Sequence, residues 1–458
     1  MTPRGHDERF DPEHCSAREL ARAIGEGQIS AREACEAAIA RIEARDGEIN
    51  AVVVRDFERA REQASARDAR RARGERPALL GVPMTVKESI DIAGLPTTWG
   101  IAPFREHRAN EDAVLVQRLK AAGAVILGKT NVPVALADWQ TVNPIYGRTL
   151  NPIDPARSPG GSSGGSAAAL AAGMVAIEVG SDIGGSLRVP AAFCGVFAHK
   201  PTFGLVPSRG HGFPGSDGAG VELAVVGPMA RHPADLELEL GIIAGPDLDA
   251  ATGYRLDLPP PRPRDLAGAR LLFLDRHPAA STSSVLTEHV GRVADVAARA
   301  GAEVCRESEL LPDLGAAHAA YSEMLGVIFT RGSPNAKNVI SAHRWMELLD
   351  AQFRLRRQWR ALFDRFDAVV TPAFGTVAYP HVENPNEPGA TLSIDGKRTP
   401  YFEQLAWPGV ATFPGLPATA VPVGATSERL PVGLQVIAGA LHDRTAIAIG
   451  TWLSRREP

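Results

Sequence analysis

Short apolar runs separated by helices and glycine-rich turns follow residue 76. The runs Pro83–Val86, Ala124–Leu127 and Val175–Val179 have the length and composition of buried strands. Between the first two runs, Asp112–Ala122 has the pattern of a helix that ends at Gly123. Strands that alternate with helices form a sheet whose faces the helices cover. The sequence therefore predicts an α/β fold.

The chain divides into three parts around this pattern. Residues 1–75 are predicted to form a helical segment packed on the core, because two Ser-x-x-Glu sequences match the capping box that starts a helix. Residues 76–258 carry the alternation of strands and helices. A proline-rich break at 258–263 opens the third part, 259–458, where the α/β pattern resumes. Strand-like runs in this part are 271–274, 368–372 and 432–438.

The composition argues against several functional classes. The 458 residues include 49 Lys and Arg against 53 Asp and Glu, so the formal net charge is −4. Without a basic excess, neither nucleic acid nor an anionic membrane surface is an expected partner. The four cysteines lack C-x-x-C spacing and the 12 histidines lack H-E-x-x-H spacing. We therefore expect no disulfide framework, no metal site and no cofactor.

The same inspection gives an expected location. No apolar stretch approaches the ~20 residues that a helix needs to span a bilayer. Residues 1–9 also lack the apolar segment of a signal peptide. We expect no membrane-spanning helix, and the cytoplasm is the default location.

The segment Gly123–Thr130 matches the phosphate-binding loop pattern G-x-x-x-x-G-K-[ST] letter for letter. Such a loop follows a strand, and its backbone amides cradle phosphate. Here a predicted helix precedes Gly123, and the four residues between the glycines are apolar, as in the centre of a strand. A buried strand is the favoured interpretation, and a nucleotide-binding protein that uses Gly123–Thr130 is kept as an alternative.

A second glycine-rich segment, Gly160–Ser166, contains the G-x-S-x-G pattern of the α/β-hydrolase nucleophile elbow. An elbow follows a strand directly, whereas residues 151–159 contain three prolines and cannot form a central strand. A flexible linker also fits poorly, because the small-residue run Ala167–Ala172 continues as a tightly packed helix. We therefore expect an ordered loop.

A third segment, Gly180–Pro190, follows the predicted strand Val175–Val179. Gly184 and Gly185 allow backbone amides to turn toward one point without obstruction by a Cβ atom. Convergent amides are what an oxyanion hole requires. A serine placed at this turn can serve as a nucleophile.

Together with Lys87, the two Gly/Ser segments resemble the amidase signature family. The resemblance covers about residues 29–439 and is densest between Gly81 and Pro207. Other parts that look like the family are Gly123–Asn131, Phe193–Gly195, Lys200–Gly204, Pro414–Pro417 and Pro431–Gln435.

The resemblance implies a Ser–cis-Ser–Lys triad, with Ser186 as nucleophile, Ser162 as the bridging serine in a cis peptide and Lys87 as base. A serine hydroxyl is a weak nucleophile until a base removes its proton. Lys87 can act as that base only when neutral, so its pKa has to fall through desolvation or nearby positive charge. Ser162 can relay the proton, because a hydroxyl both donates and accepts hydrogen bonds.

The resemblance also assigns supporting positions. The backbone amides expected to hold the oxyanion are those of Ile183, Gly184, Gly185 and Ser186. The residues expected to brace the two loops are Ser163, Asp182 and Arg188, and a structural ion pair is the favoured role of Arg188. The residues expected at the acyl pocket are Leu136, Ala137 and Trp139.

The implied fold is one large α/β/α domain around a mixed sheet, with N-terminal helices packed outside and residues 259–458 completing the same sheet with a helical insertion. The implied reaction is hydrolysis of a small-molecule carboxylic amide through an acyl-enzyme on Ser186, with release of ammonia or an amine. A glutamine-amidotransferase A-type subunit, which passes ammonia to partner chains, is the other alternative, although Leu205–His211 does not resemble that branch. The sequence leaves a homodimer open.

Overall fold

A computed structural model describes residues 11–216, 220–330 and 339–455, and its main sheet has 11 strands. In chain order these are β1 (Val52–Arg55), β2 (Pro83–Lys87), β3 (Val125–Thr130), β6 (Ile177–Asp182), β7 (Phe197–Lys200), β8 (Val225–Ala230), β9 (Arg270–Phe273), β10 (Glu303–Cys305), β11 (Ala368–Pro372), β14 (Ala418–Ala425) and β15 (Pro431–Ile437). Across the sheet the order is β1-β3-β2-β6-β8-β7-β14-β15-β11-β9-β10. β2 is parallel to β3 and β6, and β9 is parallel to β10 and β11. The other neighbours are antiparallel, so the predicted α/β fold with a mixed sheet is confirmed.

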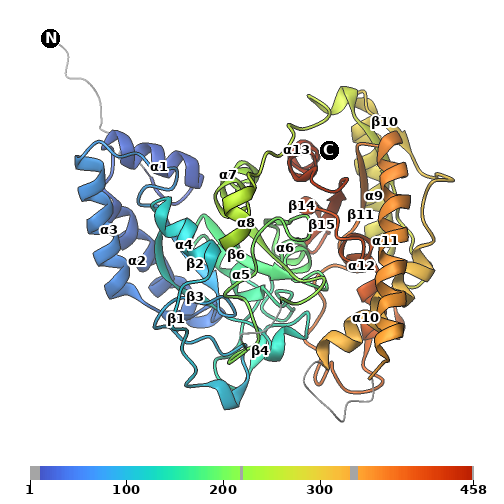
Figure 1. Ribbon diagram of the computed structural model, residues 1–458, viewed down its shortest axis with the longest axis horizontal. Coiled ribbons are helices and arrows are strands. Elements are labelled where there is room, and N and C mark those ends of the chain that lie inside the picture. The colour runs from blue at the N-terminus through green and yellow to red at the C-terminus, as the bar shows by residue number, and fades with distance from the viewer. Residues whose placement is uncertain (1–10, 217–219, 331–338, 456–458) are drawn as a thin grey trace.

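Helices cover both faces of the sheet, and Figure 1 shows α1–α3 at one end of the molecule and α10 and α11 at the other. They are α1 (Ala17–Glu26), α2 (Ala31–Ile49), α3 (Phe57–Ala72), α4 (Val114–Ala121), α5 (Gly164–Ala171), α6 (Arg188–Cys194), α7 (Pro233–Ile243), α8 (Leu248–Gly253), α9 (Ser284–Arg299), α10 (Leu314–Phe329), α11 (Ala342–Arg365), α12 (Ala406–Thr412) and α13 (Asp443–Ser454). One core joins α4, α7, α9 and α13 to one face. The opposite face packs against α2, α5 and α6 at one end and against α10–α12 at the other.

Smaller elements lie outside the main sheet. Two-stranded ribbons are formed by β4 (Val142–Asn143) with β5 (Gly147–Arg148) and by β12 (Thr391–Ile394) with β13 (Lys397–Pro400). Short 3-10 turns are η1 (Ala102–Phe104), η2 (Val134–Leu136), η3 (Leu266–Gly268) and η4 (Tyr401–Leu405).

The N-terminal part is helical as predicted, with one addition. Both capping boxes are present, because the hydroxyls of Ser16 and Ser30 accept from the backbone amides of Glu19 and Glu33, whose carboxylates reach back to the serine amides. The sequence analysis overlooked the apolar run that forms β1 and pairs antiparallel with β3. Residues 11–75 are therefore tied to the sheet by backbone hydrogen bonds as well as by packing.

The predicted parts 76–258 and 259–458 meet inside the main sheet. Their junction is the antiparallel pair β7 and β14, in which Ala198 lies opposite Ala420. No helix among the described residues is long and apolar enough to cross a membrane. The first ten residues, for which no signal peptide is predicted, lie outside the described part of the chain.

The parallel strands β2 and β6 position the catalytic candidates. Their pairing sets Val86 beside Val179, so the carboxyl ends of both strands lie at the same edge of the sheet. Lys87 ends β2, while β6 ends at Asp182 and is followed by the turn that carries Ser186. Ligand sites in α/β sheets commonly form outside the carboxyl ends of parallel strands.

Candidate active site

Lys87 places its side-chain nitrogen among three serine hydroxyls. Lys87 Nζ is 2.7 Å from Ser162 Oγ, 2.9 Å from Ser163 Oγ and 2.9 Å from Ser181 Oγ. Ser181 belongs to β6, whereas Ser162 and Ser163 directly precede α5. All four side chains are buried. The structure thus brings the predicted Lys87 and Ser162 together and adds Ser181, to which the sequence analysis gave no role.

The hydrogen bonds around Lys87 suit a neutral amine. The Ser163 hydroxyl donates to the Ser181 carbonyl at 3.3 Å, so its oxygen accepts from Lys87 Nζ. A neutral amine has two N–H donors and one lone pair. When the two N–H groups point to Ser163 and Ser181, the lone pair accepts the hydroxyl proton of Ser162. That arrangement is what a base acting through Ser162 requires.

Burial is the main influence on the charge of Lys87. Loss of hydration lowers its pKa to about 7, and the carboxylates of Asp182 and Glu178 oppose this shift. Among the described residues Lys87 forms no ion pair, since its contacts are hydroxyl groups. A substantial fraction of the lysine is therefore neutral near pH 7.

Close backbone packing directs the two serines of the second glycine-rich segment toward Lys87. A Cβ atom on Gly164 would lie only 2.1 Å from a threonine hydroxyl, so no larger residue fits there. The peptide bond between Gly161 and Ser162 is cis, as the resemblance implies. Ser163 occupies the N-cap position of α5 but makes no capping hydrogen bond. Its hydroxyl contacts Lys87 instead, which accounts for an uncapped helix start at this place.

Ser186 lies in the turn between β6 and α6 and is 5% exposed. Its carbonyl accepts a hydrogen bond from the Ser163 amide at 3.1 Å, which joins the turn to the residue after Ser162. The Ser186 hydroxyl makes no hydrogen bond to any described residue, so the contact with Ser162 that a relay needs is not formed in this structure. Catalytic hydrogen bonds are often long before substrate binds and shorten in the substrate complex.

The Asp182 carboxylate accepts a hydrogen bond from one of the backbone amides predicted to form the oxyanion hole. The Gly185 amide donates to Asp182 Oδ1 at 3.0 Å, and the Leu187 amide donates to Oδ2 at 3.1 Å. In this conformation the single N–H of Gly185 already has a carboxylate acceptor, which argues against its predicted place in the oxyanion hole. Within the described residues, the amides of Ile183, Gly184 and Ser186 have no protein acceptor.

A buried ion pair fixes Asp182. Arg188 donates to both carboxylate oxygens, at 2.7 and 3.0 Å, and also to Gln435 Oε1 at 2.7 Å and Thr412 Oγ1 at 2.8 Å. Burial disfavours the charged form of Asp182, but the charge and hydrogen bonds of Arg188 outweigh it and hold the pKa of the carboxyl below its usual value. These contacts agree with a structural ion pair, which links the Ser186 turn to α12 and β15.

The three residues expected at the acyl pocket do not form one cluster. Leu136 packs with Trp99, and Ala137 is half-buried at the end of η2. Trp139 is only 4% exposed and belongs to a separate aromatic cluster. Its indole Nε1 donates to the Gly184 carbonyl at 2.8 Å, so Trp139 contacts the turn that carries Ser186.

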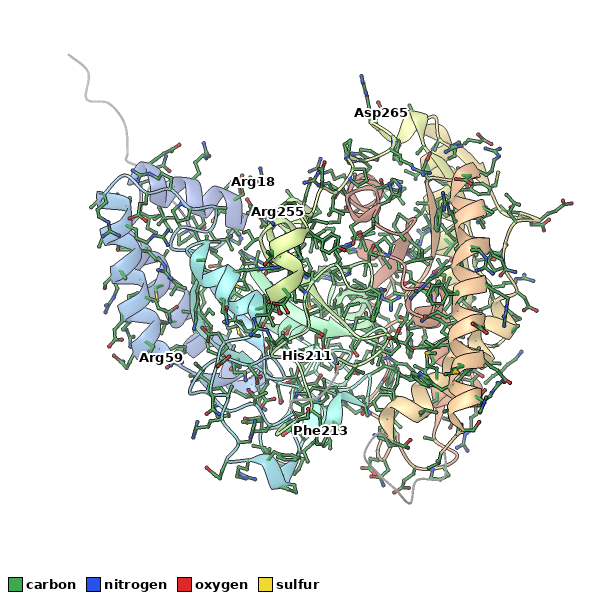
Figure 2. The ribbon with its side chains drawn as sticks, viewed as in Figure 1. Arg18, Arg59, His211, Phe213, Arg255 and Asp265 are labelled. Atoms are coloured by element: carbon green, nitrogen blue, oxygen red, sulfur yellow. The ribbon has the colours of Figure 1, made fainter. Side chains whose placement is uncertain are left out.

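The loop after β7 places His211 and Phe213 near the lysine. The sequence makes Phe213 a candidate for an apolar pocket, with core packing as the favoured role, and gives His211 no role. His211 is buried, and its Nε2 lies 3.2 Å from Ser89 Oγ. Its ring is 5.3 Å from Trp99, against which the 47%-exposed Phe213 also packs at 5.9 Å. Figure 2 labels His211 and Phe213 in the lower central part of the molecule. Burial and the charge of Lys87 lower the pKa of His211 to about 3, so the imidazole is neutral at pH 7.

The segment Gly123–Thr130 is not a phosphate-binding loop. Its residues from Val125 onward form β3, which is buried and pairs with β1 and β2. The Lys129 side chain is also buried, with Nζ hydrogen-bonded to the Pro96 carbonyl and to Thr97 Oγ1. The nucleotide-binding alternative is therefore wrong, because the amides needed for phosphate belong to a strand ladder and the lysine holds a protein loop.

Calorimetry is expected to detect no binding of Mg-ATP to the wild-type chain. Lys129→Met should instead lower the free energy of unfolding by about 1–3 kcal/mol, because it leaves the Pro96 carbonyl and the Thr97 hydroxyl without their donor. Chemical denaturation measures this loss. Micromolar Mg-ATP binding that disappears in Lys129→Met would contradict the assignment of this segment to a structural strand.

Comparison with known proteins agrees with the fold. The Amidase family model matches residues 33–325 and 315–447. The chain is 35% identical to AtzE, a 1-carboxybiuret hydrolase subunit of Pseudomonas sp. strain ADP, over 94% of this chain and 96% of that protein. It is 32% identical to the A-type subunit of glutamyl-tRNA(Gln) amidotransferase from Koribacter versatilis, over 93% and 95% of the two chains. The solved structure of a bacterial aryl acylamidase has a TM-score of 0.84 and 25% identity, with 97% of both chains covered.

The fold and the buried Lys–Ser site thus define a class of hydrolases that act on the C–N bonds of amides. The chain belongs to the amidase signature family, as its sequence predicts. The relatives include subunits of both a hydrolase and an amidotransferase, so family membership alone leaves the particular reaction undetermined.

Proposed function

We propose that this protein is an amidase that hydrolyses a small carboxylic amide through an acyl-enzyme on Ser186. The observation that carries the proposal is the contact set of Lys87: a buried lysine without an ion pair, 2.7 Å from the hydroxyl of Ser162. A charged lysine would be strongly disfavoured among neutral hydroxyl groups, whereas a neutral lysine can act as a base.

The proposed reaction has two halves. Ser186 Oγ attacks the amide carbonyl while its proton passes through the Ser162 hydroxyl to Lys87. The C–N bond then breaks, the proton returns by the same route to the leaving nitrogen, and ammonia or an amine departs. In the second half, water attacks the acyl carbon and gives one proton to the same relay. The bond between Ser186 Oγ and the acyl carbon then breaks, the relay returns that proton to Ser186, and the carboxylic acid leaves. The amides of Gly184 and Ser186 stabilise the oxyanion in both halves.

Apolar groups around the turn favour an uncharged acyl group. A Cβ on Gly184 would lie 3.1 Å from Leu405 Cδ2, and a Cβ on Gly185 would lie 2.7 Å from Pro408 Cγ. The nearby buried charges, Asp182 and Arg188, neutralise each other. A free amino acid such as glutamine needs partners for both its ammonium and its carboxylate. We therefore favour a hydrolase of uncharged amides.

The purified chain alone is expected to hydrolyse simple uncharged amides, because Lys87, Ser162 and Ser186 all belong to it. Among the described residues, no group of three His, Cys, Asp or Glu side chains could hold a metal ion. We therefore expect hydrolysis without an added partner and without a metal ion. A screen of aryl, aliphatic and peptide amides, run before and after dialysis against EDTA, measures both. Activity lost with EDTA and restored by zinc would contradict the proposed mechanism.

The second candidate is an amidotransferase subunit, which the similarity to the Koribacter versatilis protein supports. That candidate predicts glutaminase activity only when a partner chain is present. Ammonia release from glutamine, assayed with the purified chain and with co-expressed candidate partners, distinguishes the two. Partner-dependent activity on glutamine together with no activity on other amides would favour the second candidate.

A further inference from the structure

Four consecutive carbonyls in the turn that carries Ser186 are held by protein donors. The Ile183 carbonyl accepts from the Tyr321 hydroxyl at 2.7 Å, and the Gly184 carbonyl accepts from Trp139 Nε1 at 2.8 Å. The next two carbonyls accept from backbone amides, at 2.7 Å for Gly185 and 3.1 Å for Ser186. A turn held at every carbonyl has little freedom to rotate its peptide planes.

Each held carbonyl also fixes the direction of the next amide. The C=O of one residue and the N–H of the following residue share one rigid plane and point in opposite directions. The hydrogen bond to the Ile183 carbonyl therefore orients the Gly184 amide, and the hydrogen bond to the Gly185 carbonyl orients the Ser186 amide. These are two of the amides that no described residue accepts from.

The plane between Gly184 and Gly185 differs from its neighbours. Trp139 Nε1 donates to the carbonyl of this peptide plane, and the Asp182 carboxylate accepts from its N–H group. The plane between Ile183 and Gly184 has Tyr321 at its carbonyl end only. If Trp139 Nε1 is lost, the peptide plane between Gly184 and Gly185 keeps its hydrogen bond to Asp182. If the Tyr321 hydroxyl is lost, the peptide plane between Ile183 and Gly184 keeps no hydrogen bond to a described residue.

We propose that Tyr321 is a positioning residue that aims the Gly184 amide at the oxyanion formed during amide hydrolysis. Tyr321 lies on α10, 138 residues from Ile183 in the sequence, so the part 259–458 supplies the donor that orients the turn. This inference rests on the proposed function, because it assigns a task within the Ser186 reaction.

The surroundings of Tyr321 suit this task. Its side chain is fully buried, and its ring lies so close to Gly409 that a Cβ there would be 2.8 Å from Tyr321 Cδ1. The ring also packs against Phe413, with 6.3 Å between centroids. Burial raises the pKa of the phenol, so the hydroxyl keeps its proton and can donate throughout the working pH range. The ring is held independently of the hydroxyl, so Tyr321→Phe should keep the packing and remove only the hydroxyl, whose second neighbour is the Thr412 side chain.

Tyr321→Phe is expected to lower kcat about tenfold with KM changed less than about twofold, because the amide acts on the transition state and not on the bound substrate. The affinity for a substrate-like aldehyde, whose adduct with Ser186 carries an oxyanion, should fall by the same factor. Trp139→Phe should cost less than Tyr321→Phe, because Asp182 still holds that peptide plane. Matched controls are Tyr146→Phe and Trp407→Phe, which remove donors to Glu88 and Thr282 and should leave kcat unchanged.

Hydrogen exchange supplies a readout that does not depend on activity. Tyr321→Phe should speed exchange in the peptide that covers residues 183–187 by several-fold, with a smaller change elsewhere. Wild-type kcat and wild-type exchange in Tyr321→Phe would overturn the positioning role. Faster exchange in a chain whose wild type neither cleaves amides nor reacts at Ser186 would support the positioning of the turn and defeat the proposed function, so the two failures are distinguishable.

Discussion

Replacement of Ser186 by alanine is expected to abolish amide hydrolysis, with a loss of ~10⁴-fold or more, because the acyl-enzyme cannot form without the attacking oxygen. A fluorophosphonate probe should label the wild-type chain at Ser186 and leave the variant unlabelled. Ser186 makes no side-chain hydrogen bond to a described residue, so the variant should unfold at nearly the wild-type denaturant concentration. Mass spectrometry measures the site of labelling, and chemical denaturation measures stability.

Ser283→Ala is the matched control for this experiment. Ser283 is buried to the same extent as Ser186, but it is the N-cap of α9 and accepts from the Leu286 amide. Its loss should cost about 1 kcal/mol of stability and leave turnover and labelling intact. Label found on a serine other than Ser186, or turnover near the wild-type rate in Ser186→Ala, would contradict the proposal that Ser186 is the nucleophile.

The rate of hydrolysis is expected to fall as pH drops through the pKa of Lys87, which burial lowers to about 7. Protonation occupies the lone pair that receives the proton of Ser162, so only the neutral fraction of Lys87 is active. Below about pH 6, kcat/KM for an uncharged amide should fall roughly tenfold per pH unit. Lys87→Ala should lose most turnover, and Lys87→Arg should not restore it, because a guanidinium stays charged.

Lys129 provides a matched control on the neighbouring strand. It is also fully buried, and burial lowers its pKa to about 8, but its nitrogen holds the Pro96 carbonyl and the Thr97 hydroxyl. Lys129→Met should lose stability while keeping the acid limb of the profile at the same pH. A flat profile between pH 5 and 9, or an active Lys87→Arg enzyme, would show that another group supplies the base.

The sequence correctly predicted the helices and strands that depend on interactions between residues close together in the chain. The Ser-x-x-Glu pairs supply helix caps from side chains three residues apart, so both N-terminal helices begin where the sequence places them. The apolar runs before Lys87 and before Lys129 formed buried strands, and short apolar runs bounded by turns are typical of such strands. The phosphate-binding loop pattern of Gly123–Thr130 could be set aside because its apolar residues match a buried strand. Its second glycine, Gly128, serves a close approach of β1, since a Cβ there would lie 2.0 Å from the Val54 carbonyl.

The candidate site was only partly predictable. The resemblance located Lys87 and Ser162, which the fold brings within 2.7 Å of each other. Nothing in the sequence marks Ser181, because its role depends on the parallel register that sets β6 beside β2.

The α/β class and the family could both be predicted from the sequence, because they follow from local periodicity and from motifs of adjacent residues. The backbone amides of the Ser186 turn that lack an acceptor among the described residues could be identified only in the folded chain. Asp182 takes the amide of Gly185, and Tyr321 reaches Ile183 across 138 residues of sequence. Such choices depend on which donors and acceptors the folded chain brings into contact, and hydrogen-bond geometry between distant segments leaves no pattern in the local sequence.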